Sequence, residues 1–299
     1  MAMLCAGREQ GGMPHELRGL FMVVATMLGV FIAVVQSGAA ARADEGHSCD
    51  KAPAFTLAAE DAFFPYTGMF EGKLRGFSLD IVSAAFSAVG CTVNFVAMPY
   101  ARCIREVQAG RQIGCFNTTN SADNQQKFIF HDRPLFRGRI MIYAHPVRTG
   151  VFTEEDFETQ SFSVVRGYTY TDAFDRNPSI RKIAVESDLQ TLAMVARRRA
   201  DFAVVYEKVA QFQMGWNRAR IAPSPVPVHK LVEYDLFVSF SRAAEARSMM
   251  LAHALDTGLE KIRDNGTYEK IDAAWNVWLS VGVKADQPPP KWTRLGIGD

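Results

Sequence analysis

Beyond its first fifty residues the chain alternates short apolar stretches with segments of helical spacing, and this alternation most limits the folds open to it. Glycine follows the first two helical segments, at Gly90 and Gly110, where helices commonly end. Strands that alternate with helices favour a parallel sheet with crossover helices. The first set comprises predicted strands at 54–59, 92–97 and 113–116 and predicted helices at 79–89 and 100–109.

A second set follows, with predicted strands at 162–165 and 201–205 around a predicted helix at 189–198. Two further strands, near 139–144 and 234–240, join the two sets. Two crossings make a hinge, so we predict an α/β fold with two lobes and a ligand cleft at the carboxyl ends of the strands. The predicted boundaries are 53–139 plus 241–283 for lobe 1, 145–234 for lobe 2, and 140–144 and 235–240 for the hinge strands.

The rest of the chain carries two helical patterns and two proline-rich segments. The helices are expected at 243–262 and 268–278. The segment 223–227 holds three prolines and is expected to be a stiff, extended linker. The C-terminal tail, 284–299, also holds three prolines, and we expect it to be disordered or to lie on the surface.

The N-terminus has the three parts of a secretory signal. Arg8 and Arg18 precede an uncharged apolar run at 20–35, and small residues then lead to an A-x-A pattern that ends at Ala43. We predict a signal peptide over 1–43, cleaved after Ala43, and a periplasmic mature protein. An uncleaved anchor is the alternative, but the run is shorter than the roughly 20 residues of a membrane span. Met1 and Met13 are alternative translation starts.

Export changes the interpretation of the cysteines. Cys5 lies in the predicted leader, and four cysteines remain, an even number that favours disulfides in an oxidising compartment. We pair Cys103 with Cys115, which one helix-to-strand step separates, and Cys49 with Cys91, each of which lies before a predicted strand. Four free buried thiols are the alternative.

Several short motifs stand in order along the chain: GFSLDI at 76–81, MPYAR at 98–102, FIFHDRPLF at 128–136, ARRRADFAVV at 196–205, and NGTYEKI at 265–271 with Trp275 after it. In this order they resemble the motifs of the extracellular solute-binding proteins of family 3, the polar amino-acid binding components of ABC importers. The resemblance covers about residues 53–280 and implies a two-lobed periplasmic-binding-protein fold of type II. It implies a monomer that delivers a small polar ligand to a membrane permease, with no cofactor.

Two positions depart from this family's pattern. Where family members place an arginine that grips the ligand's α-carboxylate, this chain has Asn124, and asparagine cannot supply the charge. Where they place an aspartate for the α-amino group, the chain runs into Tyr206 and Glu207. The resemblance therefore implies a ligand other than an ordinary α-amino acid.

The candidate ligand-binding residues follow predicted strands or begin predicted helices. Loop aromatics can form a stacking wall, small polar residues at a strand end can expose backbone N–H groups, and Arg102 can supply the charge that Asn124 lacks. Each has an ordinary structural alternative: core packing, a capped turn, a solvated carboxylate or a structural ion pair. The predicted set is Asp61, Phe64, Tyr66, Arg102, Asn117, Thr119, Asn124, Arg166, Tyr168, Thr169, Tyr206 and Glu207.

The composition and motifs narrow the function further. A net charge of +1 gives no basic field for nucleic acid. The histidines have no metal-ligand spacing, and no nucleophile motif is present. Capture of a small polar solute for an ABC importer is thus the leading hypothesis. The alternatives are a periplasmic enzyme similar to the cyclohexadienyl dehydratases, with Glu207 or Asp61 as general acid or base, and a ligand sensor without transport.

Overall fold

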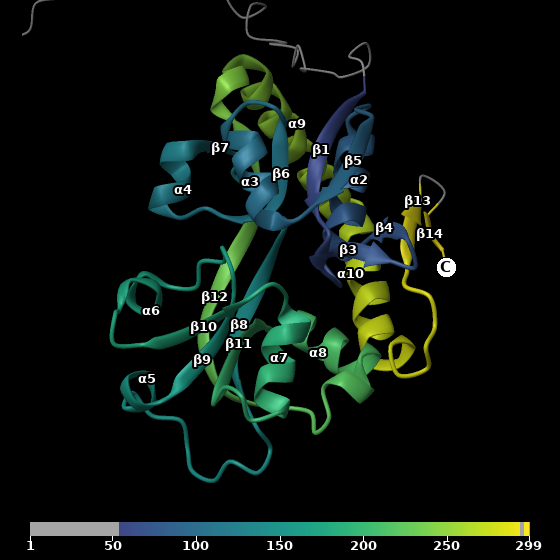
Figure 1. Cartoon of the computed structure of the whole chain (residues 1–299). Coiled ribbons are helices and arrows are strands. Elements are labelled where there is room, and N and C mark those ends of the chain that lie inside the picture. Colours follow the sequence, from purple (N-terminus) through teal and green to yellow (C-terminus); the bar gives the residue numbers. More distant parts are fainter. Residues whose placement is uncertain (1–53, 294–295, 299) are drawn as a thin grey trace, which may run out of the picture. The chain divides into compact units, whose positions relative to one another are not determined.

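A computed structural model describes residues 54–293 and 296–298 of the chain (Figure 1). The chain divides into two units, 1–46 and 47–299, and all described residues belong to the second. The predicted signal peptide, its cleavage site and Cys49 lie outside the described residues. Within the described part, no helix is both long and apolar enough to cross a membrane.

The first half of the main sheet is built around β1 (Phe55–Glu60). This strand pairs in parallel with β5 (Val93–Met98) on one side and β6 (Gly114–Thr119) on the other. The crossovers run through α2 (Phe77–Ala88) and α3 (Tyr100–Gln108), as the alternating pattern predicts. We call β5, β1, β6 and β7 (Phe128–Phe130) the first half-sheet.

The second half-sheet repeats the arrangement. Its strands β9 (Ser161–Val165), β10 (Arg181–Val185) and β11 (Phe202–Tyr206) pair in parallel. Helix α7 (Asp188–Ala196) packs on β9 and β11. The remaining helical elements between β6 and α9 are α4 (Ala122–Lys127), α5 (Asp156–Thr159), α6 (Asp172–Arg176), α8 (Glu207–Trp216), η3 (Arg218–Arg220) and η4 (Arg242–Ala244).

Two antiparallel strands join the half-sheets. β8 (Phe136–Ala144) pairs with β11, and β12 (Val226–Ser241) pairs with β8 over Val226–Leu236 and then with β6 and β7. The strand order is therefore β10-β9-β11-β8-β12-β6-β1-β5 (Figure 1). β12 is longer than the strand predicted at 234–240, and the expected linker at 223–227 already contributes its last two residues to β12.

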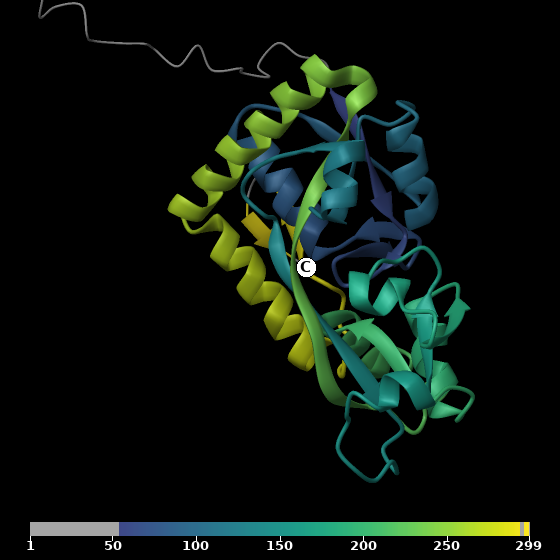
Figure 2. The same ribbon diagram turned by 90° about the vertical axis from the view of Figure 1, so that its left-hand side faces the viewer.

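The C-terminal helices complete the first half-sheet's core (Figure 2). α9 (Glu245–Asp264) packs on α2 so closely that a Cβ at Gly258 would clash with the Ala85 carbonyl oxygen. α10 (Thr267–Val277) also packs on α2, and the buried indole N–H of Trp275 donates to Asp80 at 2.9 Å. η5 (Trp278–Gly282) extends α10.

The described part of the 284–299 tail is ordered, and its residues 284–288 are exposed at the surface, in line with the second of the two expectations for it. Pro289 and Pro290 are buried, and β13 (Lys291–Thr293) pairs with β14 (Gly296–Gly298) in a hairpin next to α2. The backbone of Trp292 also hydrogen-bonds Asp80, which links the tail to the buried Trp275 contact.

One predicted disulfide is confirmed. Cys103 on α3 is bonded to Cys115 on β6, with the two Cα atoms 6.0 Å apart. Both residues are fully buried, so the bond fixes the helix against its strand inside the core. Cys91 is also disulfide-bonded.

Candidate ligand-binding cleft

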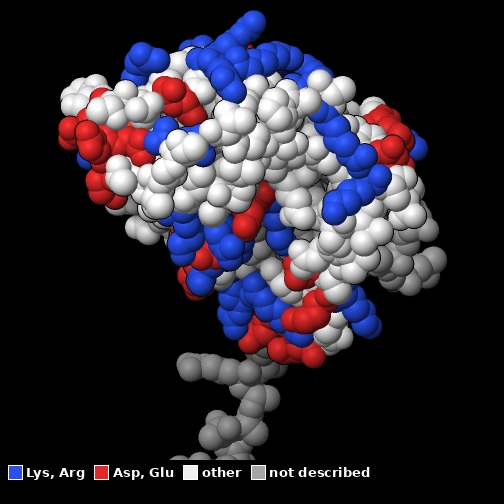
Figure 3. All heavy atoms as spheres, turned by 90° about the horizontal axis from the view of Figure 1, so that it is seen from below, with Lys and Arg blue, Asp and Glu red and all other residues white. Residues whose placement is uncertain are grey.

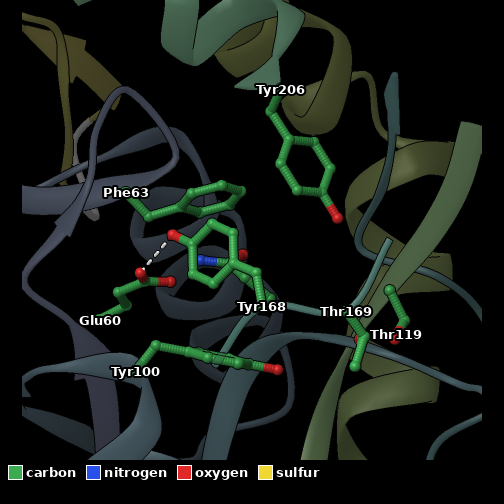
Figure 4. Close-up of a pocket in the computed structure, with 8 residues that line it drawn as sticks. Glu60, Phe63, Tyr100, Thr119, Tyr168, Thr169 and Tyr206 are labelled. Carbon is green, nitrogen blue, oxygen red and sulfur yellow. Dashed lines mark hydrogen bonds between the residues drawn. The ribbon is translucent and has the colours of Figure 1, made fainter. Parts of the chain in front are cut away.

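The inner cavity lies where the carboxyl ends of strands from the two half-sheets meet (Figure 4). Its volume is about 20 Å³, which is room for about one water molecule. The first half-sheet and the segments next to it contribute five lining residues, and the second contributes three. They are Glu60, Phe63, Tyr100, Asn117 and Thr119, and Tyr168, Thr169 and Tyr206.

Four aromatic rings form most of the wall. The ring of Tyr168 lies between those of Phe63 and Tyr100 in Figure 4, with centroid distances of 6.1 and 5.6 Å and edge-to-face geometry. Phe63 also meets Tyr206 edge to face at 5.0 Å. Tyr168 reaches this position from a turn at Gly167, whose φ of +82° is one that glycine adopts without strain.

Glu60 is the acid of the inner cavity. It ends β1, is 5% exposed, and accepts a hydrogen bond of 2.5 Å from the hydroxyl of Tyr168. Burial raises the pKa of Glu60 to about 8; the Tyr168 hydrogen bond partly opposes the shift, and the nearby Asp188 and Asp61 reinforce it. Glu60 is therefore mostly protonated at neutral pH, and its bond to Tyr168 connects the two half-sheets directly.

A second buried acid lies close to Glu60. Asp188 is the first residue of α7, and burial raises its pKa to about 7, with its own backbone N–H opposing the shift. Neither carboxyl oxygen has any other hydrogen-bond partner among the described residues. The Oδ1 atom of Asn117 in the cavity wall is also buried without a partner there, while its Nδ2 donates to Thr67 at 3.0 Å.

An outer cavity of about 490 Å³ continues from the inner one, with Thr119 and Thr169 in the walls of both. It lies between α4 and α6, where Arg176 approaches Asp123 at 3.9 Å across the cleft. Asn124 lines this outer cavity and donates its amide to the Thr119 carbonyl at 2.9 Å. The two cavities together define the cleft.

Six predicted site residues line this cleft. Asn117, Thr119, Tyr168, Thr169 and Tyr206 surround the inner cavity, and Asn124 the outer one. They come from β6 and α4 on one side, and from the end of β11 and the loop after β9 on the other.

The predicted aromatic wall lies elsewhere. Phe64 packs against Phe212, Trp275 and Trp278, and Tyr66 stacks on Phe136 at 4.4 Å, so both belong to the core. Neither lines the two cavities of the cleft.

The remaining predicted residues, all charged, also lie outside both cavities. Arg102 is exposed on α3, and Asp61 is partly exposed after β1. Arg166 pairs with Glu186 at 2.8 Å, and Glu207 pairs with Arg139 at 3.1 Å. No group of three or more His, Cys, Asp or Glu side chains in the described ranges is placed to hold a metal ion.

Sequence reasoning missed Glu60, Phe63 and Tyr100 as site residues. Glu60 and Tyr100 could have been predicted from the sequence. Glu60 directly follows the first predicted strand and Tyr100 begins the predicted helix at 100–109, and ligands of α/β sheets bind at such strand ends. Choosing Phe63 over Phe64 requires the local strand register. β2 (Ala62–Phe63) pairs with β3 (Thr67–Phe70), which in turn pairs with β4 (Lys73–Arg75).

Comparisons with known proteins agree with this architecture. Residues 55–277 match the model of the bacterial extracellular solute-binding proteins, family 3. No curated protein sequence matches the chain significantly. The solved structures that resemble it include an ancestral arginine-binding protein bound to glutamine, with TM-score 0.64, 19% identity, and coverage of 74% of this chain and 97% of that one.

Two other similar structures have different described roles. A histidine kinase sensor domain similar to periplasmic binding proteins has TM-score 0.66 and 18% identity, with 74% of this chain and 95% of that chain covered. An ancestral amino-acid-binding protein, a precursor of cyclohexadienyl dehydratase, has TM-score 0.61 and 20% identity, again with 74% of this chain and 95% of that chain covered. These likenesses confirm the two-lobed type II fold, and because the family match spans most of the molecule, the chain belongs to the family 3 bacterial extracellular solute-binding proteins.

Proposed function

We propose that this chain is an exported periplasmic protein that captures a small polar solute in its cleft and delivers it, as a monomer, to the permease of an ABC importer. The observation that carries the proposal is the inner cavity, whose wall is shared between residues of both half-sheets. A ligand bound there contacts both sides at once, so its binding energy favours the closed form.

The two joining strands supply the hinge in this proposal. Lobe 1 comprises 53–139 and 241–283, lobe 2 comprises 145–234, and β8 and β12 cross between them. Bending near 140–144 and 235–240 would open the cleft while both half-sheets stay intact. The signal peptide at 1–43 accounts for export.

Native mass spectrometry of the protein purified from its host, followed by a thermal-shift panel of metabolites, tests solute capture. We expect a co-purified small molecule, and a raised melting temperature with that compound. Transport is tested by deleting the gene and measuring uptake of the identified solute, which should fall. Normal uptake with a lost transcriptional response would instead support the sensor alternative, and absence of binding to any compound would contradict solute capture altogether.

The enzyme alternative now depends on a different residue. Glu207 is ion-paired outside both cavities and Asp61 lies in neither, whereas Glu60 lies in the inner cavity with a pKa of about 8 and can donate a proton near neutral pH. Incubation with prephenate tests this directly. Product formation that is lost in Glu60→Gln would support an enzyme, and recovery of unchanged prephenate would rule out this dehydratase activity.

A further inference from the structure

The inner cavity contains an acid without a compensating cation. The groups that act on Glu60 from neighbouring elements are Asp61, Asp188, Tyr100, Tyr168 and Tyr206, which are acids and phenols. An ionised carboxylate buried without a partner is costly, and it is normally neutralised by its own proton or by a cation. In the ligand-free protein, the carboxyl group of Glu60 is neutralised by its own proton.

The aromatic wall favours a cation as well. Phe63, Tyr100, Tyr168 and Tyr206 present four rings around the same small volume (Figure 4). Ring faces attract ammonium groups, most strongly where water is excluded, and several rings around one site form the cage that binds alkylammonium ions. Asn117 adds a buried oxygen that still lacks a hydrogen-bond donor.

The cleft offers little to a carboxylate. Among the residues that the structure describes, neither Lys nor Arg lines the inner cavity, and the basic residues of the outer cavity are Lys127 and Arg176. Arg176 already approaches Asp123 at 3.9 Å and Asp172 at 3.6 Å. A ligand carboxylate would therefore enter next to Glu60 without a bidentate partner.

The outer surface does not reverse this preference. On the face in Figure 3, basic and acidic side chains form separate small groups, and neither sign covers the face. The net charge of the chain is +1. Selection by charge is therefore expected inside the cleft, where the dielectric is low and Coulomb interactions are stronger.

We propose that the ligand is a small organic ammonium ion that carries no carboxylate, bound with its cationic nitrogen against Glu60 and within the four rings. This inference rests on the proposed solute-binding function. The Tyr168 hydroxyl occupies the ligand's place on Glu60 in the structure described here. The entering ammonium displaces that hydroxyl, the proton of Glu60 leaves to solvent, and the resulting carboxylate pairs with the cation.

The test uses pairs of related ligands of which one member carries a carboxylate and the other does not, measured by isothermal titration calorimetry on the protein from its host. The pairs are cadaverine with L-lysine, agmatine with L-arginine, and choline with glycine betaine. The neutral analogue of choline, 3,3-dimethylbutan-1-ol, separates charge from shape. In at least one pair, we expect the carboxylate-free member to bind at least tenfold more tightly than its partner, and choline to bind more tightly than the alcohol.

Substitutions of Glu60 and of a control acid test whether Glu60 determines the preference for amines. Glu60→Gln keeps the shape and should weaken amine binding at least tenfold, whereas Glu60→Asp, which keeps the charge, should retain the preference. Glu260→Gln removes an exposed acid that lies in neither cavity and should change affinity less than threefold. Thermal melts of each variant establish that it folds.

The outcomes separate this inference from the proposed function. Tighter binding of the amino acids, of dicarboxylates or of the neutral alcohol would overturn the ammonium assignment and leave solute capture intact. Unchanged amine affinity in folded Glu60→Gln would overturn it too. If amines, amino acids, dicarboxylates and sugars all fail to bind, both the inference and the proposed function are wrong.

Discussion

The hydroxyl of Tyr168 donates a hydrogen bond to Glu60 across the cleft at 2.5 Å, and so links the loop after β9 to the end of β1. The side chains therefore fill most of the space around Glu60 and leave room for about one water molecule in the inner cavity. Any solute that binds Glu60 has to compete with this hydroxyl.

Removing the competing hydroxyl should strengthen binding. We expect Tyr168→Phe, which keeps the ring, to bind its solute several-fold more tightly, because a hydrogen bond of this kind contributes about 1 kcal/mol that the ligand must otherwise displace. Calorimetric titration measures the change. Tyr143→Phe, which removes a hydroxyl from a residue outside both cavities, is the control and should leave affinity unchanged. Weaker binding by Tyr168→Phe would instead show that the hydroxyl contacts the ligand.

Binding of an ammonium ion should depend on pH through Glu60. Its pKa in the ligand-free protein is about 8, so a cation has to displace a proton below that pH. The dissociation constant for the bound amine should fall nearly tenfold per unit between pH 6 and pH 8 and then level off. Titrations in buffers of different ionisation enthalpy should show proton release. In Glu60→Gln both effects should disappear, and a wild-type affinity that is independent of pH would contradict the prediction.

The stability of the ligand-free fold should fall as the pH rises. Burial raises the pKa of Glu60 to about 8 and those of Asp80 and Asp188 to about 7. Between about pH 4 and pH 8 the folded state then binds more protons than the unfolded chain, so the stability that these three acids contribute is full below this range and is lost through it.

Asp188→Asn isolates one of these acids. We expect the variant to equal the wild type near pH 4 and to have a larger free energy of unfolding at pH 8, by on the order of 2 kcal/mol. Urea unfolding at both pH values measures the difference. Glu260→Gln changes an exposed carboxylate and should not alter the pH profile. A wild-type stability that rises toward pH 8 would refute this account.

Restoring an arginine at position 124 should admit a carboxylate. Asn124 lines the outer cavity beside Thr119, so Asn124→Arg places a guanidinium where a bidentate contact can form. We expect at least a tenfold gain in L-lysine affinity, relative to cadaverine, in paired titrations. Gln125→Arg adds the same charge to the same helix at a position outside both cavities and should give no such gain. Equal gains from both variants would indicate a general charge effect.

Much of the fold was predictable, because its signals are local. The strand and helix patterns around β1, α2, β5 and α3 place each element within two residues of its observed bounds. The long first part of β12 was not predictable from the sequence, because residues such as His229, Lys230 and Glu233 give it no alternation of apolar and polar residues. Its pairing with β8, a contact between distant segments, makes it a strand.

The site was less predictable, because contacts between segments that are distant in the sequence bring its residues together. Phe63 and Phe64 are adjacent, but Phe63 ends β2 and pairs with Thr67, whereas Phe64 begins the turn to β3, so only this local pairing decides which ring reaches the cavity. Glu60 directly follows the predicted first strand, but the partner that meets it in the cavity, Tyr168, comes from the distant second half-sheet and has no signal in the sequence around Glu60. The strand-end residues Asn117 and Thr119 were found because the strand itself has a clear local pattern.

The Trp275 to Asp80 contact also bears on the order of folding. These residues are 195 positions apart, and α9 and α10, which complete the core around α2, follow every other α-helix of the described part. The first half-sheet therefore cannot complete its core until both helices have been made, and contacts of such sequence separation form slowly. Until then the face of α2 that Gly258 approaches at Ala85 stays uncovered, so an early segment of the chain depends on a late one for its final packing.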